Sequence, residues 1–138
     1  MKKLILLVAM VSLVAACNKK DDPTPQTPDQ LLIRTWVLQS LTSTDPDYQE
    51  SGQMLLGSSW TFGADNTYQL QTSVAGFELT FSGSWSMSDD GKTLTVTTDY
   101  DGTPLTSTMT IKTLSQTELL LEESDNGMTN TFTFSVKP

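Results

Sequence analysis

The chain has 138 residues, and its 16 acidic and 8 basic side chains give a formal net charge of −8 at pH 7. It contains no histidine and a single cysteine, which excludes a Ser-His-Asp triad, a histidine general base, a histidine-ligated zinc and an intramolecular disulfide. The excess of negative charge opposes binding to nucleic acid and to anionic lipid headgroups.

The first residues predict export and lipid attachment. Lys2 and Lys3 precede an apolar stretch over 4–14 that is too short to span a bilayer. Residues 14–17, Val-Ala-Ala-Cys, resemble the lipobox of bacterial lipoproteins. The resemblance implies a signal peptide over 1–16 and a diacylglyceryl and palmitate-type anchor on Cys17. The alternative is an ordinary signal peptide followed by a chance cysteine.

Residues 17–30 form the predicted tether. They contain three prolines and almost no apolar side chain, so they cannot bury enough surface to offset the entropy of ordering. Lys20-Asp21-Asp22 resembles the export signal of surface-exposed Bacteroidota lipoproteins, and a plain solvated linker is the alternative. Removing 1–16 takes away two lysines and no acid, which leaves 6 basic and 16 acidic residues.

The remaining residues, 31–138, are expected to form one all-β domain. Apolar and polar side chains alternate with a period of two, and turn residues such as Asp101-Gly102 and Asn126-Gly127 separate the alternating stretches. The connections are too short for crossover helices. We therefore predict eight antiparallel strands in up-and-down order, closed as a small barrel or open as a sandwich. They cover 34–41, 58–62, 67–73, 77–87, 92–98, 105–114, 118–123 and 129–136.

Short motifs along these strands resemble the lipocalin-like lipoproteins of Bacteroidota. They are Trp36, Trp60-Thr61-Phe62, Gly83-Ser84-Trp85, Asp90 to Leu94, Ile111 with Leu114, and Glu118-Leu119. The resemblance implies a small lipocalin-like barrel. The better-known lipocalins carry Gly-x-Trp on the first strand, where this chain has Arg34-Thr35-Trp36.

A barrel of this size is either filled by side chains or holds one small ligand, and both readings stay open. The side chains predicted to point inward are Trp36, Leu38, Trp60, Phe62, Tyr68, Leu70, Phe77, Leu79, Phe81, Trp85, Met87, Leu94, Val96, Met109, Ile111, Leu119, Leu121, Phe132 and Phe134. Among them, the candidate lining of a ligand pocket is Trp36, Trp60, Tyr68, Phe77, Phe81, Trp85, Met109 and Phe132.

Residues 42–56 are the longest stretch of the domain without strand alternation. Asp45-Pro46-Asp47 predicts a turn, and Met54 and Leu55 belong to an apolar cluster. Resemblance to lipocalins implies a lid over the barrel mouth, in which Met54 and Leu55 either gate a cavity or plug the core.

No catalytic or metal site is expected. The acidic groups Glu122-Glu123-Asp125 and Asp99-Asp101 lie at predicted hairpin ends, where we expect solvent exposure rather than paired acid–base chemistry. They lack the calcium-loop spacing, and no phosphate-binding glycine loop is present. We expect no enzyme and no cofactor.

Two non-enzymatic functions remain. One is a lipid-anchored lipoprotein of the cell envelope, at the outer membrane, that binds a small hydrophobic ligand. The other is an envelope structural or interaction module with a filled core that binds protein or glycan. A carboxylate hydrolase is a much weaker third reading.

Overall fold

The computed structural model describes residues 24–138. The predicted signal peptide, Cys17 and most of the predicted tether lie outside the described residues. Residues 28–30, assigned to the tether from sequence, instead begin a short helix, α1 (Pro28–Leu32). Thr27 caps this helix by accepting a hydrogen bond from the amide of Gln30, whose side chain accepts one from the Thr27 amide.

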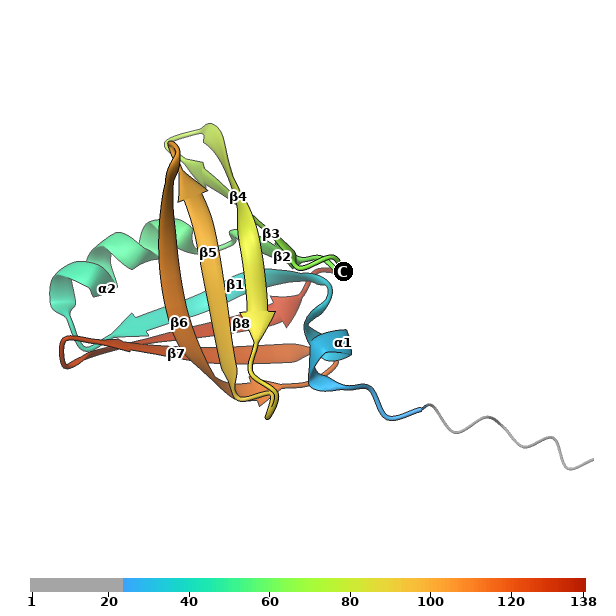
Figure 1. The fold of residues 1–138 in the computed structure, drawn as a ribbon. Helices are drawn as coiled ribbons and strands as arrows, with labels where there is room; N and C mark the ends of the chain where they lie inside the picture. The colour runs from blue at the N-terminus through green and yellow to red at the C-terminus, as the bar shows by residue number, and fades with distance from the viewer. Residues whose placement is uncertain (1–23) are drawn as a thin grey trace, which may run out of the picture.

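The prediction of eight antiparallel strands is confirmed, and they close into a barrel in the order β1 to β8 (Figure 1). Each predicted strand corresponds to an observed one. The barrel form, rather than the open sandwich, follows from pairing of the last strand with the first. The strands are β1 (Thr35–Ser43), β2 (Ser59–Phe62), β3 (Thr67–Val74), β4 (Phe77–Met87), β5 (Thr93–Tyr100), β6 (Thr103–Leu114), β7 (Glu118–Asp125) and β8 (Met128–Val136).

Three hairpins are joined by two residues that both have positive φ. These pairs are Ala75-Gly76, Asp101-Gly102 and Asn126-Gly127. Two consecutive positive φ angles are typical of the type I′ turn, whose twist matches that of the strands it joins. Glycine and asparagine adopt this conformation readily, whereas alanine at 75 does so at a cost.

One end of the barrel is closed by α1, which packs through Leu32 against the buried Trp36. Leu32 is buried, and its carbonyl accepts a hydrogen bond from Trp36 Nε1 at 3.0 Å. The Arg34 guanidinium lies 5.5 Å from the Trp36 ring centroid, and its Nη1 donates to the Gln116 carbonyl at 2.8 Å. The C-terminus lies at the same end as α1 (Figure 1). Trp36 is therefore a structural residue of the closed end.

The other end is covered by α2 (Pro46–Gly52) and the short 3₁₀ helix η1 (Gln53–Leu55). Sequence predicted a turn at 45–47; Asp45 instead caps α2 by accepting from the amide of Asp47. Gln49 Nε2 and Gln53 Nε2 both donate to the Leu41 carbonyl, at 3.1 and 3.3 Å. These bonds tie the helical segment to β1.

The inward prediction was wrong for two residues of β4. Phe77 is 73% exposed and Leu79 is 40% exposed. The alternation of β4 continues without a break, but the β3–β4 hairpin extends beyond the end of the barrel (Figure 1). Side chains near its tip therefore lie on the same face of the strand as the core residues, but no opposite wall of the barrel is there for them to pack against. Tyr100 and Leu105, on the neighbouring β5–β6 hairpin, are also exposed.

Candidate ligand site

A cavity of about 200 Å³ lies inside the barrel beneath α2 and η1. It is bordered by side chains from both helical segments and from six of the eight strands. These are Tyr48, Leu55, Trp60, Tyr68, Leu70, Val96, Thr98, Ser107, Met109, Glu123 and Phe132.

Aromatic packing forms much of the cavity wall. The Trp60 ring lies edge-on to Tyr68, with centroids 5.8 Å apart, and 6.0 Å from Phe132. Trp60 Nε1 donates to the buried hydroxyl of Ser58 at 3.1 Å, so its polar atom is satisfied away from the cavity. What Trp60 presents to the cavity is an apolar face.

The structure brings together half of the eight residues predicted to line a pocket. Trp60, Tyr68, Met109 and Phe132 border the cavity. The other four lie elsewhere: Trp36 at the closed end, Trp85 against Phe62 and the Gly63 carbonyl, Phe81 stacked on Tyr100, and Phe77 at a hairpin tip. For Phe77, Phe81, Trp36 and Trp85, the placement in the pocket lining was wrong.

Of the two predicted lid residues, only one borders the cavity. Leu55 is partly buried and borders the cavity, whereas Met54 is exposed and does not. Consecutive residues of a 3₁₀ helix point in different directions, so only one of the pair faces the barrel. Leu55 contributes to the roof together with Tyr48 of α2.

Sequence reasoning missed the polar part of the lining. Glu123 was expected to be a solvated hairpin-end acid, but it is half-buried and borders the cavity. It continues the inward alternation of Leu119 and Leu121, and Thr98 likewise continues that of Leu94 and Val96. The alternation was the signal that could have identified both. Tyr48 lies in a segment without such alternation.

Burial raises the pKa of both tyrosines that border the cavity. Burial is the cause for Tyr68, which is 3% exposed. For Tyr48, burial is the larger cause and the negative charge of Glu123 the smaller one. Both hydroxyls therefore stay protonated and available as hydrogen-bond donors at neutral pH.

The comparisons with known proteins concern the fold. No family model matches the chain, and no curated protein sequence matches it. Solved structures of bovine odorant-binding protein are similar, one of the complex with undecanal and one of the protein from nasal mucosa. In both comparisons the TM-score is 0.52 at 23% sequence identity, over 86% of this chain and 78% of that chain.

The barrel is lipocalin-like. That agrees with the fold implied by the sequence motifs. Within residues 24–138, no group of three or more acidic or cysteine side chains is arranged to hold a metal ion. No helix of the described part has the length and apolar character needed to cross a membrane.

Proposed function

We propose that this lipocalin-like protein binds a small apolar molecule in its barrel. The observation that carries the proposal is the cavity beneath α2. An apolar cavity of about 150 Å³ accommodates benzene, and the cavity here is about 200 Å³. The volume suits an apolar group of roughly eight carbon atoms. This is smaller than a drug-sized ligand, which needs at least about 300 Å³.

The proposal includes a lipid anchor on Cys17 and a place in the bacterial cell envelope, at the outer membrane. Its support is the sequence alone: the basic residues, the short apolar stretch and the lipobox-like Val-Ala-Ala-Cys. Metabolic labelling of host cells with an alkyne-bearing palmitate tests the anchor. Labelling of the wild-type chain but not of Cys17→Ser is expected, and equal labelling of both would contradict it. Membrane fractionation of the same cells tests the location.

Native mass spectrometry of the protein purified from its own host tests ligand binding. We expect an additional mass of roughly 100–200 Da, in keeping with about eight carbon atoms, that is lost on denaturation. Val96→Phe fills the cavity from the buried face of β5 and should abolish this mass. Thr95→Phe, on the opposite face of the same strand, is the matched control. An apo mass for the wild-type protein, with no uptake of added probes, would contradict the proposal.

A second function is favoured by a separate observation. Phe77, Leu79, Tyr100 and Leu105 expose large apolar side chains on the two hairpins that extend beyond the barrel. Exposed apolar surface of this kind is typical of interaction sites. Under this function the chain is an envelope module that binds a protein or glycan at the hairpin tips. Loss of crosslinked partners in Phe77→Ser cells, with retention in Val96→Phe cells, would favour it over ligand binding.

A further inference from the structure

The barrel wall is open between β6 and β7 next to the cavity. The two strands pair only between Thr110–Leu114 and Leu119–Glu122. Beyond Glu122, β7 pairs with β8 alone, and the first seven residues of β6 pair with β5 alone. Figure 1 shows β6 rising away from β7 at this end. A groove of about 540 Å³ occupies the opening, and we call it the side slot.

The side slot and the cavity share part of their lining. Tyr48, Ser107 and Glu123 border both. The remaining residues of the side slot are polar except for Met128: they are Thr106, Thr108, Ser124, Asp125, Met128 and Asn130. A molecule placed across the shared residues would therefore have an apolar part in the cavity and a polar part in the side slot.

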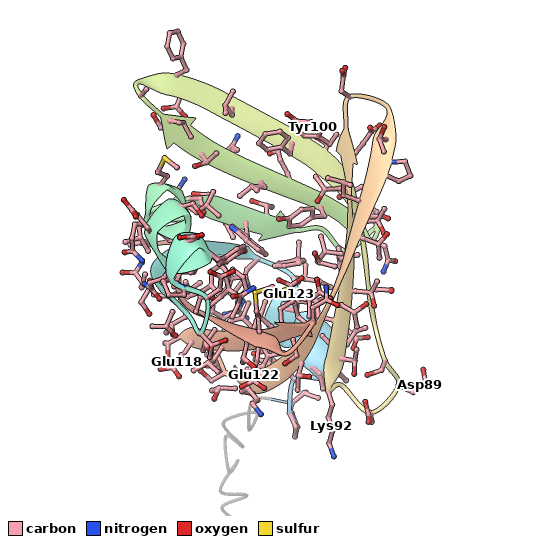
Figure 2. All side chains as sticks on the ribbon, turned by 90° about the vertical axis from the view of Figure 1, so that its left-hand side faces the viewer. Asp89, Lys92, Tyr100, Glu118, Glu122 and Glu123 are labelled. Carbon is pink, nitrogen blue, oxygen red and sulfur yellow. The ribbon has the colours of Figure 1, made fainter. Side chains whose placement is uncertain are left out.

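Glu123 stands at the junction with little compensation for its charge. Its one hydrogen bond from a described residue comes from Asn130 Nδ2 at 3.5 Å, which is long. The ion pair found among residues 24–138 joins Lys112 Nζ to Glu122 Oε1 at 3.4 Å, on the neighbouring residue of β7. Figure 2 looks toward this end of the barrel, with Glu123 near the centre of the view and Glu122 below it. Neither of these contacts places a cation beside the Glu123 carboxylate.

The Tyr68 hydroxyl is a second polar group at the cavity wall. Tyr68 is 3% exposed and borders the cavity, yet its hydroxyl has no hydrogen-bond partner among the described residues. This hydroxyl is therefore free to bond to water or to a polar group of a ligand in the cavity. The cavity thus offers an unused donor and acceptor at Tyr68 and an unpaired anion at Glu123.

We infer that the ligand is a small amphiphilic amine, with its protonated amine at Glu123 in the side slot and its apolar part in the cavity. The inference rests on the proposed ligand binding and specifies the class of ligand. A protonated amine supplies the cation that Glu123 lacks, and the bond it makes is charge-assisted. Asp125, which also borders the side slot, adds negative charge on the same side. An anionic amphiphile such as a fatty acid would be repelled at this position.

Three probes with the same apolar chain test the inference: octylamine, octan-1-ol and octanoate. Isothermal titration calorimetry at pH 7 is carried out on the full chain bearing Cys17→Ser, so that no attached acyl group competes for the cavity. We expect octylamine to bind about tenfold more tightly than octan-1-ol and octanoate to bind weakest. Glu123→Gln should remove the preference for the amine, because it lowers the affinity for octylamine more than the affinity for octan-1-ol.

Glu118→Gln is the matched control, since Glu118 is an exposed carboxylate on the same strand that does not border the cavity. This variant should retain the preference. Equal affinities for the amine and the alcohol, unaffected by Glu123→Gln, would overturn the inference and leave the proposed apolar binding intact. Failure of all three probes to bind a folded protein, verified by its thermal unfolding, would overturn both.

Discussion

Asn130 lies between two other polar side chains at the cavity end of the barrel. Its Oδ1 accepts a hydrogen bond from Ser43 Oγ at 2.6 Å, while its Nδ2 donates to Glu123 Oε2 at 3.5 Å. One buried amide therefore connects β1, β8 and β7 where the barrel wall begins to open. Asn130 is only 7% exposed, and these two neighbours supply hydrogen bonds to its amide.

Replacement of this amide should destabilise the protein. Asn130→Ala removes the acceptor of the Ser43 hydroxyl proton and the donor to the Glu123 carboxylate, and we expect the free energy of unfolding to fall by about 1–3 kcal/mol. Urea denaturation measures it. Thr131→Ala, on the outward face of the same strand, should cost less. Equal losses in the two variants would show that the amide bonds contribute nothing.

Trp85 should matter for stability and not for ligand affinity. Its Nε1 donates to the Gly63 carbonyl at 2.9 Å and its ring packs perpendicular to Phe62, but it does not border the cavity. Trp85→Ala should cost about 3–5 kcal/mol of unfolding free energy. Trp85→Phe is a milder change that should leave the protein folded. It should lower the free energy of unfolding by about 1 kcal/mol and keep the wild-type affinity for octan-1-ol. A fall in affinity without a fall in stability would place Trp85 at the ligand.

Gly83 allows two strands to approach closely. A Cβ added there would lie 1.8 Å from the Thr97 carbonyl oxygen, which belongs to the backbone and cannot rotate away. We expect Gly83→Ala to lower the free energy of unfolding by about 3 kcal/mol, as measured by chemical denaturation. In Gly76→Ala no atom is close to the new methyl, so only backbone strain applies, and its cost should be about 1–2 kcal/mol. A smaller loss for Gly83→Ala than for Gly76→Ala would contradict the clash.

Ala75 offers a stabilising substitution. Its φ is +52° in the β3–β4 turn, where the equivalent residue of the β7–β8 turn is Asn126 at +49°. Ala75→Asn should raise the free energy of unfolding by about 0.5–1 kcal/mol, because asparagine tolerates the left-handed region better. The thermal unfolding midpoint reports the gain. The reverse change, Asn126→Ala, should lower it by a similar amount, and a gain there would refute the turn argument.

The free energy of unfolding should decrease in acid, in part because two aspartates in turns become protonated. Asp65 accepts from the Thr67 hydroxyl at 2.6 Å, and Asp90 accepts from the Ser88 hydroxyl at 2.6 Å. These hydrogen bonds lower the pKa of each aspartate in the folded protein. A lowered pKa in the folded state means that the carboxylate stabilises the fold above its ordinary pKa. This stabilisation is lost as the pH falls through the lowered value.

Urea denaturation between about pH 6 and pH 2.5 measures this effect. The double variant Asp65→Asn, Asp90→Asn should be less stable than wild type at pH 6 and should lose less stability on acidification. Asp89→Asn, whose carboxylate makes no hydrogen bond to a described residue, should follow the wild-type curve. An unchanged slope in the double variant would count against the two bonds.

The strands were predictable because local rules decide them. Alternation of apolar and polar side chains placed each strand within about two residues, and pairs such as Asn126-Gly127 located the turns. The alternation could not show where the barrel ends. Phe77 lies on the same face of β4 as the buried Trp85, yet it is outside the core. Nor could the alternation predict α2, whose position depends on the bonds of Gln49 and Gln53 to the Leu41 carbonyl.

The candidate site was less predictable than the fold. Trp60 and Met109 were identifiable as large inward side chains, but the cavity depends on how all of them pack together, which no single strand reveals. Glu123 was assigned to solvent because acids at hairpin ends are usually exposed. Its inward direction was present in the alternation with Leu119 and Leu121, but its place beside the opening between β6 and β7 is a tertiary feature without a local sequence pattern.

The pairing of β1 with β8 has a consequence for how the chain folds. Trp36 lies opposite Val136, one hundred residues later, whereas every other strand pairing in the described chain joins sequence neighbours. Closing so long a loop is entropically costly and slow. During synthesis the barrel cannot close until its last strand has emerged. A chain truncated before Met128 would leave β1 and β7 with free edges, open to pairing with other molecules and hence to aggregation.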